Sequence, residues 1–558
     1  MTMKTDVEIA NSVELKPIVE IAESLGLSSE ELHPYGRDKA KVDLSVLKKP
    51  RNTNKPSRLV LVSAITPTPA GEGKTTTTIG LGQAMGQLGQ STCLALREPS
   101  LGPCMGIKGG AAGGGYSQVA PADSINLHFT GDFHAITSAH NTLAAVLDNH
   151  IHFGNKLNID TRRVLWPRVM DMNDRALRNI VVGLGGVLQG VPREAHFNIT
   201  AASEIMAILC LSQDMDDLRR RLDRILVAYT TDKKPVLAGE LNATGAMLAL
   251  LRDALMPNLV QTLEGTPVLV HGGPFANIAH GCNSVIATKM AMHLAEWTIT
   301  EAGFGFDLGG EKFFDVKCME NGLDVAAVVL VATVRALKMH GGKKKNDLTT
   351  SAPEAVERGL PNLQRHIESV QQFGKTPIVA INRFGHDTDD EIEVIRQFCR
   401  SAGIPCALSN HFAEGGRGAL ELAELLVREG QKEQSSLTPM YQREDSPEDK
   451  IRSVARNIYG ARDVVFSKRA LYDLNQVRTH GYENLPICIA KTQSSLSDDP
   501  AKLGRPTDFD VTVQQIQINS GAGFLVVLTG DIMRMPGLPR SPQSERIDVV
   551  DGVIVGLA

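Results

Sequence analysis

Cysteine is scarce in this sequence, and no cysteine stands in a pattern that metal or redox chemistry uses. The eight cysteines of the 558-residue chain form no C-x-x-C pair and no zinc-ligand spacing. We therefore expect reduced thiols, as in a cytoplasmic protein. A reactive thiol is conceivable at Cys104, which lies in a glycine-rich segment. Because nothing else in the sequence implies sulfur chemistry, we interpret Cys104 as a small apolar filler.

Long apolar runs are also absent. The most apolar stretches, such as residues 205–211 and 326–332, are far shorter than the roughly 20 residues that span a bilayer. The first 25 residues mix charged and apolar side chains and lack the apolar centre of a signal peptide. We therefore predict no export and no membrane partner.

Neither sign of charge dominates the composition. The 58 Lys and Arg residues stand against 63 Asp and Glu residues, for a net charge of -5. This balance gives no general electrostatic reason to bind nucleic acid or an anionic membrane. Any anion site must therefore be local.

Strand-like runs rich in Val, Ile and Leu alternate with amphipathic segments. Apolar residues recur every three or four positions in residues 214–226, 243–255 and 389–401, which predicts helices. Alternation of this kind is typical of a parallel sheet covered on both faces, so the predicted fold class is α/β, doubly wound. The predicted strands are residues 58–65, 91–96, 179–184, 267–271, 326–333 and 377–382.

Polar stretches divide the chain. Residues 341–352 and 430–449 have loop composition, and residues 509–529 alternate like antiparallel strands. These shifts predict three domains. They are a large nucleotide-binding domain of residues 1–365, an α/β domain of residues 366–505 and a small C-terminal domain of residues 506–558.

A glycine loop joins the first predicted strand to a helix that runs toward Leu88. Glycines let backbone N–H groups turn toward a phosphate, and the helix N-terminus adds partial positive charge. A lysine then reaches the terminal phosphates and a hydroxyl can bind magnesium, the roles predicted for Lys74 and Thr75. The match to the phosphate-loop pattern is imperfect, since Thr68 replaces its first glycine. The predicted nucleotide-binding residues are Thr68, Pro69, Ala70, Gly71, Glu72, Gly73, Lys74 and Thr75.

A second glycine-rich segment follows the next predicted strand. Residues 97–115 include seven glycines in nineteen positions, so the backbone can approach a ligand closely. Arg97 lies at the carboxyl end of that strand, where open α/β sheets bind ligands. It is placed to hold a second anion with its guanidinium fork, although a structural ion pair with a carboxylate is the alternative.

Residues 127–141 are dense in histidine and acid. A metal site with Asp132 and His134 is conceivable. However, no H-E-x-x-H pattern occurs, and the six-residue spacing of His134 and His140 does not place them on one helical face. We favour hydrogen-bonded histidines that line a polar cleft.

The two glycine segments, residues 66–78 and 97–151, resemble signature regions of the formate–tetrahydrofolate ligases of the monofunctional bacterial type. The resemblance continues in residues 300–313, 334–342 and 377–384 and covers nearly the whole chain. It implies an ATP-dependent ligase of one-carbon metabolism.

The resemblance also implies a mechanism and site residues. Formate attacks the γ-phosphate of magnesium ATP, and N10 of tetrahydrofolate then attacks formyl phosphate, giving 10-formyltetrahydrofolate, ADP and phosphate. Lys74 and Thr75 match the family's phosphate and magnesium contacts, and Arg97 matches the arginine that holds formyl phosphate. The loop around Gly309 resembles a further backbone contact to this intermediate.

The family's pterin site is similar to a pair of aromatic residues, here Phe384 and Phe412, which follow predicted strands at 378–382 and 407–410. Phe412 stands where the family has tryptophan, so the stacking surface is smaller. Packing in the core is the alternative for both rings.

Two other functions compete with this reading. One is a phosphate-loop ATPase of the partitioning or metal-loading type, and the other is a ligase that forms a different acyl phosphate. The second anion segment and the paired phenylalanines argue against a mechanical ATPase. The resemblance further implies a homotetramer and activation by a monovalent cation, K+ or NH4+.

Overall fold

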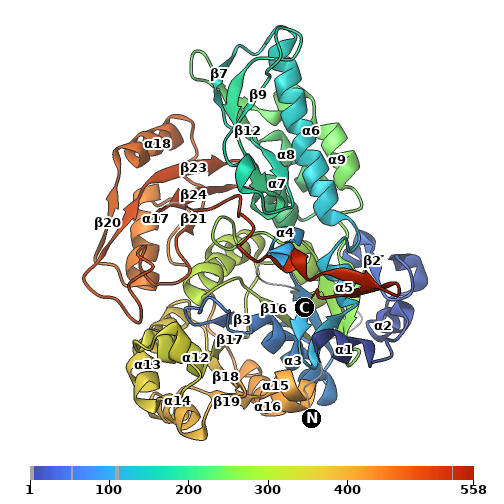
Figure 1. The fold of residues 1–558 in the computed structure, drawn as a ribbon, viewed down its shortest axis with the longest axis vertical. Helices are drawn as coiled ribbons and strands as arrows, with labels where there is room; N and C mark the ends of the chain where they lie inside the picture. Colours follow the sequence, from blue (N-terminus) through green and yellow to red (C-terminus); the bar gives the residue numbers. More distant parts are fainter. Residues whose placement is uncertain (1–4, 52–54, 107–111, 531, 558) are drawn as a thin grey trace.

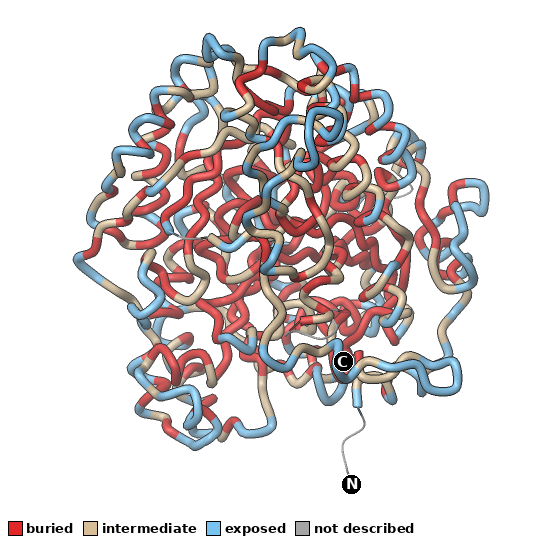
Figure 2. Tube along the Cα trace, turned by 45° about the horizontal axis from the view of Figure 1, so that its top comes forward, coloured by how far each residue is buried: buried red, intermediate tan, exposed pale blue. Residues whose placement is uncertain are grey.

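The structure is a computed structural model that describes residues 5–51, 55–106, 112–530 and 532–557. A large central sheet lies between helices, and smaller sheets occupy the two upper lobes (Figure 1). Buried residues fill the interior of the molecule, and exposed residues lie mainly at its periphery (Figure 2). Within the described ranges, no helix is both long and apolar enough to cross a membrane.

The central sheet has twelve strands, and its middle is parallel. Val, Leu, Ile and Ala dominate these strands, and nearly every residue in the inner ones is buried, as expected for strands covered on both faces. In spatial order the parallel strands are β15 (Pro267–Val270), β4 (Thr92–Leu96), β16 (Trp297–Glu301), β3 (Arg58–Ala64), β17 (Ala327–Ala332), β18 (Pro377–Asn382) and β19 (Cys406–Ser409).

Consecutive residues of β3 point to opposite faces of the sheet. Leu59 joins the hydrophobic cluster that α13 (Pro353–Gln372) covers, whereas Val60 joins the cluster that α3 (Lys74–Gln87) covers. Because both faces are apolar, each needs a helical layer to exclude water. The predicted α/β class with a large, mostly parallel sheet is confirmed.

One edge of the sheet is antiparallel, which the sequence pattern did not indicate. β14 (Asn258–Thr262) runs antiparallel to β15, and β2 (Ala40–Val42) with β1 (Leu32–Pro34) extends this edge. The sheet is therefore mixed.

An upper lobe holds α6 (Asp132–His152) beside a small sheet of β7 (Ile159–Val164), β12 (Leu226–Thr230) and β13 (Pro235–Leu237) (Figure 1). The helix predicted over 214–226 is shorter, since α8 spans Met215–Asp223 and residue 226 already begins β12. The helix predicted over 389–401 is confirmed as α14 (Asp389–Ser401).

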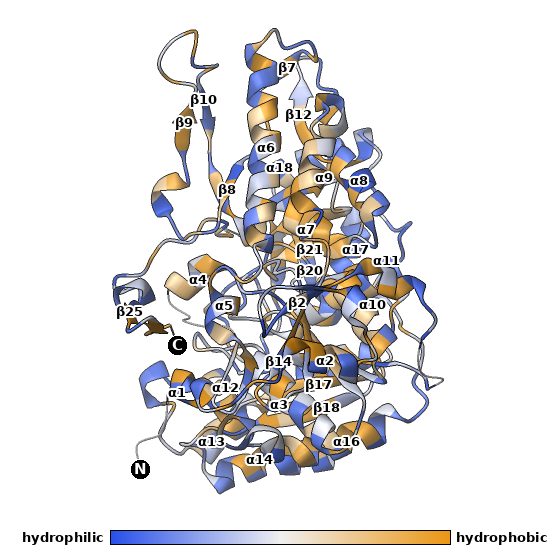
Figure 3. Cartoon of the chain, turned by 90° about the vertical axis from the view of Figure 1, so that its right-hand side faces the viewer, coloured by the Kyte–Doolittle hydropathy of each residue, from blue (hydrophilic) through white to orange (hydrophobic). Residues whose placement is uncertain are grey.

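The strand predicted over 179–184 is wrong as a member of the central sheet. β9 (Ile180–Val182) pairs with β10 (Arg193–Ala195) in a separate hairpin that projects from the molecule (Figure 3). Val181 is 53% exposed and Leu184 is 67% exposed. The apolar composition therefore misidentified a surface hairpin as a buried strand.

The C-terminal lobe is only partly antiparallel. β23 (Gln515–Asn519) and β24 (Phe524–Leu528) pair antiparallel, which confirms part of the prediction. β22 (Asp510–Val513) instead pairs in parallel with β20 (Asp463–Phe466), and β24 also pairs in parallel with β21 (Ile487–Ala490). The domain boundaries stay predictions, although these pairings cross residue 505 and the central sheet continues beyond residue 365.

Candidate active site

The glycine loop lies where the sequence placed it, between the buried strand β3 and the helix α3. Gly71 and Gly73 have φ angles of 78° and 72°, which other residues rarely adopt. Gly73 is the N-cap of α3, so the loop ends at the partial positive charge of a 14-residue helix. Lys74 is the first residue of that helix.

Side chains from neighbouring strands hold this loop in place. The Glu72 carboxylate accepts hydrogen bonds from the Thr68 N–H, at 2.6 Å, and from the Thr333 hydroxyl. Asn382 Nδ2 donates to the Glu72 carbonyl at 3.0 Å. A Cβ atom at Gly73 would lie 2.5 Å from Asn382 Nδ2, so this close approach also requires glycine. Glu72 thus stabilises the conformation of the glycine loop.

Glu301, at the end of β16, contacts both Thr75, the predicted magnesium ligand, and Arg97, the predicted anion-binding residue. Its Oε2 accepts a hydrogen bond from Thr75 Oγ1 at 2.7 Å, and its Oε1 lies 3.3 Å from Arg97 Nη2. The carboxylate is buried, with the Glu301 side chain 4% exposed. The structural ion pair considered for Arg97 is therefore present. Arg97 Nε, however, is buried without a hydrogen-bond partner in the described structure, which leaves a donor for an anion.

The turn after β16 packs closely against Arg97. A Cβ atom at Gly303 would lie 2.8 Å from Arg97 Nη1, so the missing side chain leaves room for the guanidinium. A Cβ at Gly309 would lie 2.1 Å from the Gly303 carbonyl oxygen. The Gly309 N–H donates to the Gly305 carbonyl at 3.1 Å, so Gly309 is part of the hydrogen bonding within the turn. Its contact with a reaction intermediate stays a prediction.

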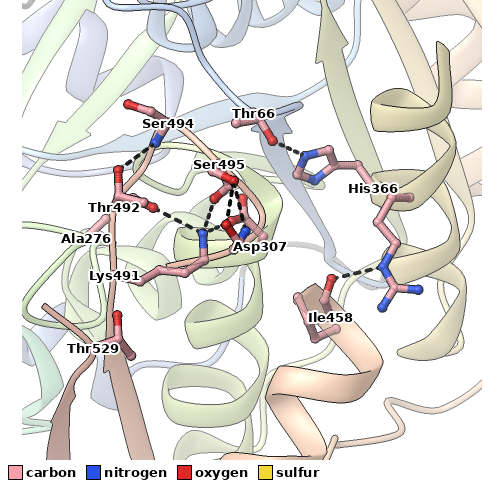
Figure 4. Close-up of polar contacts among 12 residues, drawn as sticks. Thr66, Ala276, Asp307, His366, Ile458, Lys491, Thr492, Ser494, Ser495 and Thr529 are labelled. Carbon is pink, nitrogen blue, oxygen red and sulfur yellow. Dashed lines mark hydrogen bonds and ion pairs between the residues drawn. The ribbon is translucent and has the colours of Figure 1, made fainter. Parts of the chain in front are cut away.

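A buried polar network fixes this turn from the C-terminal half of the chain (Figure 4). Lys491 Nζ lies 2.7 Å from Asp307 Oδ2, and neither side chain is more than 1% exposed. Nearby, His366 Nε2 lies 3.0 Å from Thr66 Oγ1, at the start of the glycine loop. Burial lowers the pKa of His366 to about 4, so this imidazole is neutral near pH 7.

Phe384 and Phe412 follow neighbouring parallel strands, as predicted. β18 and β19 pair in register at Asn382 and Ser409, which places both phenylalanines beyond the same edge of the sheet. The Phe384 ring lies under the Arg335 guanidinium, with 4.6 Å between the Arg335 Cζ atom and the ring centroid. Phe384 is half-buried and Phe412 is 42% exposed, so neither is a fully buried core residue. Their contact with a pterin stays a prediction.

Phe412 lies against the second glycine segment. Its backbone carbonyl accepts the Tyr116 N–H at 2.9 Å, and a Cβ atom at Gly114 would lie 3.1 Å from the ring. Residues 107–111 of this segment, which include Lys108, lie outside the described residues, so the predicted anion role of the whole segment stays a prediction. Cys104 is buried, as expected of a small filler.

The histidine-rich segment begins in the loop before α6, where Phe129 packs in the same cluster as Ile79 of α3, and continues into that helix. His140 is buried, hydrogen-bonded to Ser203 Oγ at 2.8 Å and stacked on Trp166. Burial lowers its pKa to about 3. It lines a cavity of about 570 Å³ between the two upper lobes. The preferred interpretation, a hydrogen-bonded histidine at a cleft, is confirmed for His140, and Asp132 instead pairs with Lys41 at 2.7 Å.

The oxygen atoms at the loop suit magnesium that arrives with a nucleotide. Hydroxyl and carboxylate oxygens are its preferred ligands, and Thr75 and Glu301 bring one of each together. In the part of the chain that the structure describes, no group of three or more His, Cys, Asp or Glu residues is arranged to hold a metal. Protein ligands and nucleotide phosphates together would therefore complete the coordination.

Sequence reasoning did not assign roles to Glu301, Thr333 and Asn382. Each lies at the carboxyl end of a central strand or directly after it, in β16, β17 and β18 respectively. Polar residues at that edge are the signal that could have found them, since open α/β sheets bind ligands there. The sheet order brings them to the loop although they are more than 200 residues from it in sequence.

The structure is that of an α/β protein with a glycine loop and the Arg97 guanidinium at the carboxyl edge of its parallel strands. Both groups suit anionic ligands. The family model described as formate–tetrahydrofolate ligase matches residues 4–558. The chain therefore belongs to the formate–tetrahydrofolate ligase family, whose members are ATP-dependent ligases that join formate to tetrahydrofolate. This result decides against the partitioning or metal-loading ATPase and against a ligase for a different acyl group.

Proposed function

We propose that the enzyme forms 10-formyltetrahydrofolate, ADP and phosphate through formyl phosphate. The observation that carries the proposal is the contact of Glu301 with both Thr75 and Arg97, which joins the glycine loop to an arginine side chain at one sheet edge. We further propose that the central domain is a doubly wound domain of the phosphate-loop NTPase type, because helices cover both faces of its parallel strands.

The first step is phosphoryl transfer to formate. A formate oxygen attacks the γ-phosphorus, the bond to the bridging oxygen of ADP breaks, and formyl phosphate forms. The glycine-loop N–H groups and Lys74 stabilise the charge that spreads over the transferred group. Thr75 and Glu301 would hold magnesium, which when bound would neutralise part of the phosphate charge. Arg97 holds formate near the γ-phosphate and then holds the new acyl phosphate.

The second step is acyl transfer to tetrahydrofolate. The N10 nitrogen attacks the carbonyl carbon, the carbon–oxygen bond to phosphate breaks, and the N10 proton passes to the departing phosphate. Arg97 stabilises the departing phosphate by charge-assisted hydrogen bonds. Phe384 and Phe412 stack on the pterin, and their position beyond β18 and β19 brings it to the same sheet edge as the loop.

Several properties expected from the resemblance are part of this proposal. They are a homotetramer, activation by K+ or NH4+ and a cytoplasmic location. The balanced composition supports small-molecule substrates rather than nucleic acid.

The test is release of ADP measured with formate alone, tetrahydrofolate alone and both together. We expect sustained ADP release only with both substrates. Without tetrahydrofolate, formyl phosphate stays bound in the site and prevents another turnover. Release that is independent of formate and tetrahydrofolate would overturn the proposal.

A further inference from the structure

Arg335 contacts both predicted substrate sites. It lies in the first turn of α12 (Val334–His340), directly after β17, and is half-buried. Its Nη2 donates a hydrogen bond to the Gly71 carbonyl in the glycine loop. Its Cζ lies 4.6 Å from the centroid of the Phe384 ring. We propose that Arg335 is a positioning residue that couples nucleotide binding to folate binding, an inference that rests on the proposed function.

The contact with Gly71 orients a donor of the glycine loop. A trans peptide is planar, so the Gly71 carbonyl and the Glu72 N–H point in opposite directions. Since Arg335 holds the Gly71 carbonyl, the Glu72 N–H points away from Arg335. In the same way, Asn382 holds the Glu72 carbonyl, so the Gly73 N–H points away from Asn382. In the described structure, neither N–H donates a hydrogen bond, so both are available to a phosphate.

The contact with Phe384 fixes one face of the ring. A guanidinium over an aromatic face is attracted by the ring quadrupole, and the attraction is stronger in a partly desolvated site. Since Arg335 covers one face, a pterin can stack only on the opposite face. The Phe384 backbone is held as well, because its N–H donates to Asp387 Oδ2 at 2.8 Å. Together these two contacts favour one position of the Phe384 ring.

Coupling follows from these two contacts on one rigid group. Guanidinium atoms are coplanar, so a displacement of the glycine loop moves the cation over the ring, and a displacement of the ring moves the donor to the loop. Asn382 and Phe384 are two residues apart in the chain, so the end of β18 forms a second link between the sites. Each ligand therefore orders part of the other's site, and linkage requires the effect to be reciprocal.

The experiment measures binding of a non-hydrolysable ATP analogue with and without saturating tetrahydrofolate, and of tetrahydrofolate with and without the analogue, by titration calorimetry. For the wild type we expect each ligand to raise the affinity for the other by at least about fivefold. Arg335→Met should reduce this factor to near one. Arg335→Lys should restore part of it, because lysine keeps the charge and can donate to a carbonyl but lacks the planar guanidinium. Arg452→Met, which removes a similar contact with Phe466, should leave the factor unchanged.

Each other outcome is informative. An Arg335→Met enzyme that keeps the wild-type factor would overturn the proposal, as would a wild type whose ligands bind independently. Loss of nucleotide affinity alone, with tetrahydrofolate affinity unchanged, would also overturn it. If Arg335→Met does not fold, Phe384→Leu tests the same link, since it removes the ring but keeps the hydrogen bond to Gly71. A wild-type enzyme that binds no tetrahydrofolate would instead contradict the proposed function itself.

Discussion

Replacement of Phe412 by alanine should weaken tetrahydrofolate binding while the protein stays folded. The ring is 42% exposed, whereas the adjacent His411 is buried. His411 Nδ1 lies 2.8 Å from Ser409 Oγ, and its Nε2 lies 3.4 Å from Thr77 Oγ1 of α3. His411 therefore anchors the short helix α15 (His411–Glu414), and we expect Phe412→Ala to leave this anchor intact.

The expected magnitudes follow from this exposure. Full burial of a phenylalanine side chain stabilises a protein by roughly 1.5–3 kcal/mol, and Phe412 is only a little over half buried. Its loss should therefore cost about 1–2 kcal/mol of unfolding free energy. A stacked aromatic pair contributes roughly 0.5–1.5 kcal/mol beyond area burial, which is about a twofold to twelvefold change in tetrahydrofolate affinity.

The assay is steady-state turnover with one substrate varied at a time, beside urea unfolding. Phe412→Ala should raise the KM for tetrahydrofolate several-fold and leave the KM for ATP nearly unchanged, and Phe412→Trp should lower the KM for tetrahydrofolate. The matched control is Phe153→Ala, since Phe153 is 72% exposed and lies at the end of α6. A Phe412→Ala protein that unfolds, or that folds with unchanged tetrahydrofolate affinity, would refute the reasoning.

Three further predictions follow. Lys74→Ala should abolish ATP turnover with unchanged circular dichroism, since its charge stabilises transferring phosphate; normal turnover would refute the assignment. Arg97→Ala should leave nucleotide affinity nearly intact and slow both the synthetic and the ADP-consuming reverse reaction, and a loss of ATP affinity as severe as in Lys74→Ala would assign Arg97 to the nucleotide. Burial raises the pKa of Glu204 from 4.5 to about 7, so its neutral form stabilises the protein below pH 4.5, and this contribution is lost as the pH rises to about 7. Glu204→Gln should flatten that part of the urea-measured pH profile, and an unchanged slope would contradict the pKa shift.

The central strands were predictable because burial on both faces leaves a nearly continuous apolar run. β3, β17 and β18 begin and end within about a residue of their predicted limits. The same signal failed for β9, whose apolar residues are exposed in a hairpin. Apolar composition alone does not reveal which partner, if any, covers a strand.

The candidate site was predictable only where the chemistry lies in one continuous segment. The glycine loop and Arg97 each carry a local pattern. Glu301 and Arg335 lie far from the loop in sequence, and they reach it through a sheet order in which β16 and β17 flank β3. Strand order depends on tertiary packing, which no local pattern encodes.

The most direct test of a formyl phosphate pathway is to follow the oxygen of formate. The enzyme is supplied with formate labelled with oxygen-18, ATP and tetrahydrofolate, and the released phosphate is analysed by mass spectrometry. If a formate oxygen attacks the γ-phosphorus and the carbon–oxygen bond then breaks, each phosphate carries one labelled oxygen. Phosphate without the label, released while 10-formyltetrahydrofolate accumulates, would contradict the pathway.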